Sequence, residues 1–240
     1  MTPNEERILK QTLDFGGYVT TELLSLWRPD IHYRNQTRPL SNLASEKYLI
    51  VREEYSIGRA SSIYQVTQRT CAYFRRPNSF LRNKKSLPTV HRALIRSYYL
   101  FDLLGKGYRA EDVMSHGDEK ISYFRNLGIR ELALPAKYNS GNRLTQIEEY
   151  LLLASPITGE GELTILYINK PASSEWHQLH TVLSKYSVLS QQINCPPLTL
   201  LIICEHDHEC HAYERAATSS KIKHDMQVRA EKINHIFFPP

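Results

Sequence analysis

The sequence predicts a mixed α+β or α/β protein with two unlike halves, and three observations favour this fold class. The 240 residues are enough for one large domain or two small ones. Hydrophobic residues make up 41% of the chain and charged residues 23%, which is an ordinary balance for a soluble globular protein. The first half has helical hydrophobic spacing followed by strand-like spacing, whereas helical and strand-like segments alternate in the second half.

The composition argues against three other classes of protein. No stretch approaches the roughly eighteen consecutive apolar residues of a membrane-spanning helix. The N-terminus lacks the basic segment and following apolar segment of a secretory signal. The four cysteines are too few and too scattered for a disulfide framework in a chain of this length. We therefore expect a cytoplasmic protein.

The charge is unevenly divided along the chain. Residues 1–110 contain 18 lysines and arginines against 9 aspartates and glutamates, a net charge of +9. Residues 111–240 contain 12 against 16, a net charge of −4. A basic first half joined to a mildly acidic second half favours a polyanion, such as a nucleic acid, as the partner of the first half. Chance variation of charge between small domains is the alternative explanation.

Helical signals open the chain. Apolar residues in the segment 8–15 have helical spacing, and Gly16 with Gly17 ends that helix. Thr20 and Thr21 then offer an N-cap to a second helix, which an apolar run continues.

A third helix and a hairpin complete the first predicted domain. The helix fits within residues 34–45, where Pro39 is tolerated only if it lies in the first turn. Two strand-like runs follow at residues 48–54 and 62–67, with a turn around Gly58 between them. Three helices followed by a hairpin is the order of a winged helix-turn-helix, whose third helix enters the major groove of DNA. We therefore predict a winged-helix DNA-binding domain over residues 1–68.

The beginning of the third predicted helix carries side chains that can read base edges or phosphates. These candidate DNA-binding residues are Arg34, Asn35, Gln36, Thr37 and Arg38, and Arg59 at the tip of the hairpin would touch a phosphate. The alternative is a winged helix that contacts another protein and whose polar helix is merely solvated.

Residues 69–110 form a predicted basic helical bridge in which cations alternate with aromatic side chains. Such a mixture suits a path for a nucleic-acid strand, with cations on the phosphates and rings under the bases. The cations assigned to DNA binding are Arg75, Arg76, Arg82, Lys84 and Lys85. Several rings share helical spacing with Val90 and Leu94, so core packing explains most of the rings better than base stacking does.

Helical and strand-like segments alternate in the second half. Helices are expected near residues 119–127, 174–191 and 213–217, and strands near 131–134, 147–153, 163–168, 198–203 and 233–238. Helix, three strands, helix and strand is the order of a restriction-endonuclease-like α/β domain with a mixed central sheet. We assign residues 111–240 to such a domain.

Acidic residues stand where a nuclease core of this kind holds one or two divalent cations. Glu148 and Glu149 open one predicted strand, and Asn169 and Lys170 close the next. Because a tight turn joins these strands, we expect the four catalytic candidates at one end of the sheet. Asp118 precedes a helix and would join the two glutamates as a ligand of Mg²⁺ or Mn²⁺. Lys170 would stabilise developing charge. Alternatively, the glutamates are ordinary charges at a strand end, one of them facing solvent and the other in a salt bridge.

Residues 204–211 hold a second polar cluster, Cys-Glu-His-Asp-His-Glu-Cys-His. Its spacing matches no standard zinc site, because Cys204 and Cys210 are six apart and no CxxC pair is present. His206 and His208 resemble the paired histidines of tyrosine relaxases and rolling-circle nucleases, although Asp207 stands between them where those proteins have a bulky apolar residue. A polar loop between a strand and a helix is the alternative explanation.

Five short motifs resemble those of the MobC-type plasmid mobilisation relaxases, which belong to the replication–relaxation family. They are residues 70–74 (Thr-Cys-Ala-Tyr-Phe), 86–92 (Ser-Leu-Pro-Thr-Val-His-Arg), 116–121 (His-Gly-Asp-Glu-Lys-Ile), 147–150 (Ile-Glu-Glu-Tyr) and 167–170 (Tyr-Ile-Asn-Lys). The family joins a winged helix to an endonuclease-like core and is similar over most of the chain. The resemblance implies binding at a plasmid transfer origin and metal-dependent nicking or relaxation of supercoiled DNA for conjugative transfer. It also implies double- and single-stranded plasmid DNA, a coupling protein and relaxosome accessory proteins as partners.

One position departs from the family's pattern. Where such cores carry an acidic residue on the third strand, this chain has Tyr167 or Asn169, and a neutral group binds a hard cation more weakly than a carboxylate does. A non-catalytic DNA-binding accessory or regulatory protein with a degenerate nuclease core is therefore the main alternative. A relaxase that uses a tyrosine nucleophile together with His206 and His208 is a third hypothesis.

Overall fold

The computed structural model describes residues 1–28, 33–52, 62–76, 86–155, 159–169, 175–220 and 225–233. The chain divides into two compact units, Met1–Ala110 and Glu111–Asn234. Both units mix helices with strands, so the predicted mixed α+β class is confirmed. In the described part of the chain, no helix is long and apolar enough to cross a membrane.

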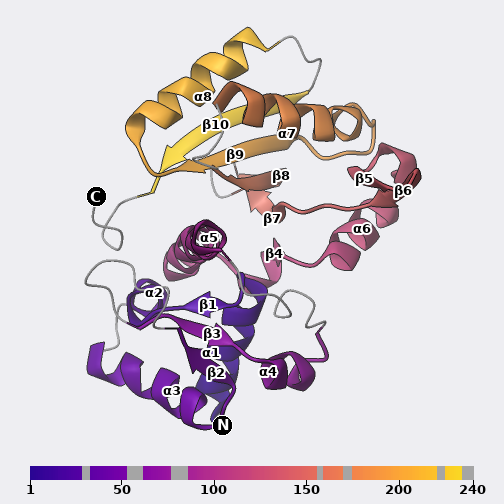
Figure 1. Cartoon of the computed structure of the whole chain (residues 1–240). Helices are drawn as coiled ribbons and strands as arrows, with labels where there is room; N and C mark the ends of the chain where they lie inside the picture. Colours follow the sequence, from indigo (N-terminus) through magenta and orange to yellow (C-terminus); the bar gives the residue numbers. More distant parts are fainter. Residues whose placement is uncertain are drawn as a thin grey trace. The chain divides into compact units, whose positions relative to one another are not determined.

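The described part of the first unit combines five helices with a small antiparallel sheet (Figure 1). In chain order its elements are α1 (Pro3–Asp14), β1 (Tyr18–Val19), α2 (Thr21–Trp27), α3 (Tyr33–Ser45), β2 (Leu49–Val51), β3 (Tyr64–Val66), α4 (Gln68–Tyr73) and α5 (Leu87–Gly105). The strands lie in the order β1-β3-β2, and both neighbouring pairs are antiparallel. Helices α4 and α5, which belong to the segment predicted as a basic bridge, lie within this unit.

Local signals in the sequence place the ends of α1 and α2. Thr2 begins α1 with a capping box: its hydroxyl accepts a 3.2 Å hydrogen bond from the Glu5 amide, and the Glu5 carboxylate accepts a 2.7 Å bond from the Thr2 amide. Thr20 caps α2 by accepting a 3.3 Å bond from the Leu23 amide. Gly16, with a φ of +127°, follows the end of α1. The expected helix end and N-cap are thus confirmed.

Pro39 lies inside α3 rather than in its first turn, so this expectation was wrong. A proline inside a helix removes one main-chain hydrogen bond and usually kinks or ends the helix. Here Leu40 and Leu43 are 0% and 1% exposed, and their burial stabilises a continuous helix despite the lost bond.

Helix α5 packs closely against α2. Phe101 of α5 contacts Phe15 edge to face, with ring centroids 5.2 Å apart, and lies 5.6 Å from the ring of Trp27. At the end of α5, Gly105 lies so near the main-chain carbonyl oxygen of Leu26 that a Cβ atom would overlap it. Glycine at position 105 is therefore a requirement of this packing.

Within the described residues, the second unit has a five-stranded mixed sheet and a separate two-stranded hairpin. In chain order its elements are the 3₁₀ helix η3 (Ala110–Asp112), β4 (Val113–Met114), α6 (Gly117–Asn126), the 3₁₀ helix η4 (Glu131–Ala133), β5 (Ala136–Asn139), β6 (Asn142–Thr145), β7 (Tyr150–Ser155), β8 (Gly159–Ile168), α7 (Glu175–Ser190), β9 (Leu198–Cys204), α8 (Asp207–Ser219) and β10 (Met226–Lys232). The large sheet has the order β10-β9-β8-β7-β4. Strands β8, β9 and β10 are parallel, whereas β7 is antiparallel to β8 and β4 to β7.

Helices α7 and α8 cover one face of this sheet (Figure 1). Alternate residues of the strands point to that face; Ile165 of β8 and Leu200 of β9 are paired in the sheet and are 0% exposed. They belong to one hydrophobic core with Leu183 and Tyr186 of α7 and Tyr213 of α8. Because β8 and β9 are parallel, the helices that follow them both begin at the carboxyl edge of the strands.

Three predictions for the second unit need correction. The strand expected at residues 131–134 is the helix η4, because so short an apolar run does not distinguish a strand from a turn. The hairpin of β5 and β6 was not predicted, although Ser140 and Gly141 have the positive φ values, +49° and +83°, of a two-residue hairpin turn. The last described strand is β10 instead of residues 233–238, of which 234–238 lie outside the described residues. As an edge strand, β10 alternates apolar with polar or charged residues and so lacks a long apolar run.

Replacing Gly105 by alanine should lower the stability of the protein, because the new methyl group overlaps a main-chain carbonyl rather than a side chain that can move. We expect the free energy of unfolding, measured by urea denaturation and circular dichroism, to fall by about 2 kcal/mol or more. Gly117→Ala is the control, since a Cβ atom at position 117 meets no atom within 4 Å and alanine favours a helix. Equal effects of the two substitutions would contradict the close packing of α2 on α5.

Candidate functional site

Polar residues from two strand ends gather at one edge of the five-stranded sheet. Tyr150 of β7 pairs with Leu166 of β8, and the two strands are antiparallel. The residues just before β7 therefore lie at the same edge as those just after β8. This edge carries Glu148 and Glu149, which directly precede β7 instead of opening it as predicted, and Asn169, which directly follows β8 instead of closing it.

Glu149 is held by two side chains of helix α7. Both of its carboxylate oxygens accept 2.9 Å hydrogen bonds from the Lys185 ammonium group, and Oε2 also accepts a 2.6 Å bond from the Tyr186 hydroxyl. The side chains of Glu149 and Lys185 are 9% and 16% exposed, and Tyr186 is fully buried. Burial and the neighbouring Glu149 carboxylate raise the pKa of Tyr186 well above its ordinary value, so its hydroxyl stays a hydrogen-bond donor.

Glu148 forms the outer part of the same cluster. Its carboxylate pairs with the ammonium groups of Lys137, on β5, and of Lys185, the latter 3.5 Å away. Burial by itself would raise the pKa of Glu148, but the hydrogen bond from Lys137 and the charge of Lys185 outweigh burial, and the pKa is lowered. Two glutamates and two lysines thus balance one another in charge.

A further lysine, Lys120 of α6, supports this cluster and was missed by the sequence analysis. It is 1% exposed, and its ammonium group donates 2.8 Å hydrogen bonds to the main-chain carbonyl oxygens of Ile147 and Glu149. It also lies 5.7 Å from the centre of the Tyr150 ring. Lys120 thereby fixes the backbone that carries both glutamates. One signal for its burial was present, since Lys120 shares a helical face with Phe124, four residues later.

Tyr167 and Asn169 are the neutral residues that stand where the resembling family carries an acidic residue, and both form hydrogen bonds with side chains of helices α7 and α8. The Asn169 side-chain oxygen accepts a 2.8 Å hydrogen bond from the Tyr213 hydroxyl of α8. The Tyr167 hydroxyl donates a 3.1 Å bond to the side-chain oxygen of Gln178 on α7. All four residues are buried, so these bonds satisfy polar atoms that have left water.

The residues present fit ammonium groups better than a divalent cation. Both oxygens of Glu149 face Lys185, so a Mg²⁺ or Mn²⁺ ion would have to displace this lysine. Asp118 is exposed in the first turn of α6, and Lys170 lies outside the described residues. Among the residues that the structure describes, no group of three or more His, Cys, Asp or Glu side chains is placed to hold a metal ion.

The polar cluster at residues 204–211 is the end of β9 and the beginning of α8. The Glu209 carboxylate caps the helix by accepting 3.0 Å hydrogen bonds from the main-chain amides of His206 and of the residue before it. The exposed rings of His206 and His208 stack with their centroids 5.3 Å apart. Asp207 pairs with Lys232 at 2.5 Å, which lowers the pKa of Asp207. The helix expected at 213–217 therefore begins already at residue 207.

Helix α3 of the first unit exposes part of the candidate DNA-reading set. Asn35 and Arg38 are exposed, and Thr37 is half-buried. The side chains of Arg34 and Gln36 lie outside the described residues.

Of the remaining DNA-binding candidates, some lie within the described residues and the others do not. Arg75 is exposed, and the half-buried Arg76 has its guanidinium group 3.7 Å from the Asp14 carboxylate. Four candidates lie outside the described residues: Arg59, Arg82, Lys84 and Lys85.

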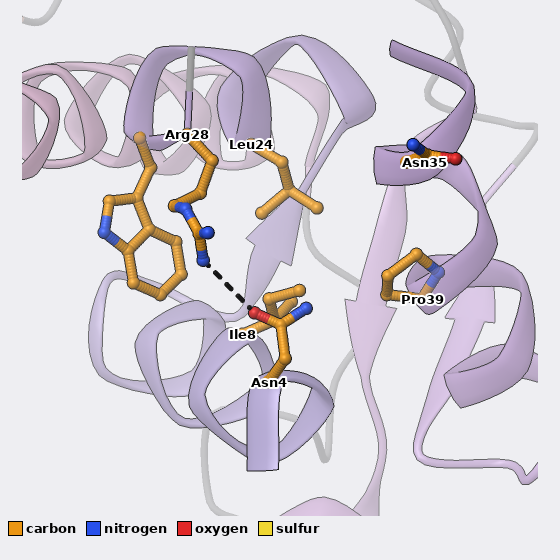
Figure 2. Close-up of a pocket in the computed structure, with 7 residues that line it drawn as sticks. Asn4, Ile8, Leu24, Arg28, Asn35 and Pro39 are labelled. Atoms are coloured by element: carbon orange, nitrogen blue, oxygen red, sulfur yellow. Dashed lines mark hydrogen bonds between the residues drawn. The ribbon is translucent and has the colours of Figure 1, made fainter. Parts of the chain in front are cut away.

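A small pocket, open to solvent, lies between α3 and the helices α1 and α2. Its lining residues are Asn4, Ile8, Leu24, Trp27, Arg28, Asn35 and Pro39. Figure 2 shows Asn35 and Pro39 of α3 on one side and the Arg28–Asn4 hydrogen bond, 3.4 Å long, on the other. The pocket thus borders the helix that carries the exposed Asn35 and Arg38.

No protein-family model, no curated protein and no solved structure matches the chain. A function for the protein therefore rests on the charge of its two units, the order of their elements and the geometry of these sites.

Removing Lys185 should destabilise the protein, because the Glu149 carboxylate would remain in a largely buried place without its cation. For Lys185→Met we expect a loss of about 3 kcal/mol in the free energy of unfolding. The double variant Lys185→Met/Glu149→Gln leaves no buried charge unpaired and should recover most of that loss. Urea unfolding of both single variants and the double variant gives the coupling energy of the pair. A coupling energy near zero would show that the pair does not stabilise the fold.

The lowered pKa of Glu148 predicts a stability that is sensitive to acid. Such a carboxylate stabilises the fold above its ordinary pKa of 4.5 and loses this contribution as the pH falls through the lower, folded-state pKa. The difference in unfolding free energy between the wild type and Glu148→Gln should therefore be constant above about pH 5 and shrink at lower pH. Urea unfolding at a series of pH values measures this difference in free energy. A difference that does not change with pH would contradict the lowered pKa of Glu148.

Proposed function

We propose that the protein binds DNA through its first unit and serves as an accessory or regulatory factor in plasmid mobilisation. The order of elements in this unit carries the proposal: helices α1, α2 and α3 precede the hairpin of β2 and β3, and the sheet order is β1-β3-β2. This is the order of a winged helix-turn-helix, in which α3 would enter the major groove. The exposed Asn35 and Arg38 of α3 and the net charge of +9 in residues 1–110 support a DNA partner.

The second unit favours a binding role over a cutting role. Its strands β7, β8 and β9 and the intervening helix α7 follow the order of an endonuclease-like core. Its glutamates, however, are paired with Lys137 and Lys185, and the residue that follows β8 is the neutral Asn169. We therefore infer a degenerate nuclease core. The link to plasmid mobilisation comes from the short motifs that resemble the MobC-type relaxases.

Duplex binding is tested by fluorescence anisotropy with labelled DNA from a transfer origin. Arg38→Ala should weaken binding by about tenfold and lower the dependence of affinity on salt, because α3 loses a cation that contacts DNA. Arg125→Ala is the matched control, since Arg125 is an exposed arginine of the second unit, paired with Glu131. Equal affinities of the wild type and Arg38→Ala would contradict a reading role for α3.

Metal-dependent nicking is the second candidate function, favoured by the gathering of Glu148, Glu149 and Asn169 at one sheet edge. Supercoiled plasmids with and without the origin are incubated with the protein and either Mn²⁺ or EDTA, then run on a denaturing agarose gel. The binding proposal expects no open circles. Metal-dependent open circles on the origin plasmid alone would establish nicking, and Glu149→Ala should then abolish nicking without weakening duplex binding. A protein–DNA adduct that survives denaturant would instead indicate a tyrosine nucleophile.

A further inference from the structure

The first unit carries a ring cluster, made of Tyr48, Tyr73 and Phe74, beside the ends of α3 and α4. Tyr73 contacts Tyr48 and Phe74 edge to face, with ring centroids 5.8 Å and 4.9 Å apart. The Arg69 guanidinium lies over the Tyr48 ring at 4.4 Å, and it donates a 2.8 Å hydrogen bond to the main-chain oxygen of Glu46. The cluster therefore combines aromatic rings with an arginine that is fixed in place.

Tyr73 is the exposed member of the ring cluster. Its side chain is 46% exposed, whereas Tyr48 and Phe74 are half-buried beside it. The Tyr73 hydroxyl donates a 3.1 Å hydrogen bond to the Glu6 carboxylate, which holds the ring from its far end. An exposed ring that is already fixed loses little conformational freedom when a flat ligand stacks on it.

Two cations are the chain neighbours of ring-cluster residues and occupy main-chain positions that favour glycine. Lys47, just before Tyr48, has a φ of +62°, and Arg75, just after Phe74, has a φ of +53°. Each ends its helix in a Schellman motif. The two motif hydrogen bonds are 2.9 and 3.0 Å long after α3 and 2.7 and 3.1 Å long after α4.

At two other helix ends, the position that corresponds to Lys47 and Arg75 is a glycine. Helices α5 and α6 end in the same motif with Gly107 and Gly128, whose φ values are +94° and +76°. A side chain in the left-handed region costs conformational energy that glycine avoids. Lys47 and Arg75 are exposed, and neither side chain has a hydrogen bond or ion pair with another described residue. Contacts within the described fold therefore do not compensate for the strain at these two positions.

We propose that the ring cluster, with Lys47, Arg69 and Arg75, is a platform for single-stranded DNA. A base stacks on Tyr73, and the three cations beside the ring cluster neutralise the adjoining phosphates. The strand must be single because bases in a duplex are stacked on one another and offer no free face to a protein ring. This inference rests on the proposed DNA-binding function and adds a second site, separate from the surface of α3 that would read a duplex.

The stacking part is tested by fluorescence anisotropy of the full chain with labelled oligothymidylate of about twelve nucleotides. Tyr73→Ala should weaken binding by about tenfold, whereas Tyr73→Phe keeps the ring, loses only the hydroxyl bond to Glu6 and should therefore bind much more tightly than Tyr73→Ala. An oligonucleotide of equal length with abasic sites keeps the phosphates and removes the bases. The wild type should bind it more weakly than oligothymidylate, and Tyr73→Ala should bind it as the wild type does. Equal binding of oligothymidylate by Tyr73→Ala and the wild type would overturn the proposal.

The cations are tested by Lys47→Gly and Arg75→Gly, which restore the residue that the backbone favours. Each variant should unfold at a higher temperature than the wild type and yet bind oligothymidylate more weakly. The slope of log affinity against log salt should become shallower by about 0.7 for each cation removed. Lys106→Gln removes an exposed cation from the end of α5 and should change neither affinity nor slope. Unchanged affinity in both glycine variants would overturn the proposal.

Duplex binding, measured on the same samples, separates this inference from the proposed function. If the wild type binds origin duplex but oligothymidylate binding is absent, the platform is wrong and the proposed function stands. If oligothymidylate binding depends on Tyr73 while duplex binding is absent, the platform is supported and the proposed role of α3 is wrong. An acidic peptide that displaces oligothymidylate equally from the wild type and Tyr73→Ala would identify a site for anions without base stacking, which overturns the proposal.

Discussion

The second unit depends on the parallel pairing of β8 with β9. Parallel neighbours cannot be joined by a tight turn, so the chain crosses over through α7, and this crossover covers one face of the sheet. The same geometry brings the end of β8 and the beginnings of α7 and α8 to one edge. Antiparallel β7 begins at that edge as well. The directions of the strands therefore bring the polar residues of the candidate site to one edge, and attraction between their charges is not needed for this.

Charge pairing then decides what this edge can do. Lys185 and Tyr186 are neighbours in α7 and both bind Glu149, which ties the helix to the beginning of β7. Lys120 adds a second tie, from α6 to the main chain of the same segment. A carboxylate that a fixed ammonium group already neutralises is a poor ligand for a metal ion, because the ion must displace a lysine that is itself partly buried. The contacts that stabilise this edge thus oppose metal binding there.

The first unit combines tight packing with strain at selected positions. Gly105 allows α5 to approach the main chain of α2, and Gly107 ends α5 without strain. Lys47 and Arg75 accept strain at equivalent positions next to the ring cluster. In our proposal, DNA provides the contacts that compensate for this strain. Under this proposal, glycine helix ends serve the fold, whereas the Lys47 and Arg75 helix ends serve a ligand.

Local signals in the sequence determined much of the secondary structure, including the cap at Thr20, the helix end at Gly16 and the strands at β7, β8 and β9. The sequence also indicated that Glu148 and Asn169 belong to neighbouring strands. Local rules failed at Pro39, where burial of the neighbouring leucines outweighs a lost hydrogen bond, and at the edge strand β10, whose polar alternation is a weak signal. Only the tertiary structure decided the partners of the charged groups. Lys185 lies 36 residues from Glu149, so their pairing depends on which face of the sheet α7 covers, and no local pattern in the sequence records that face.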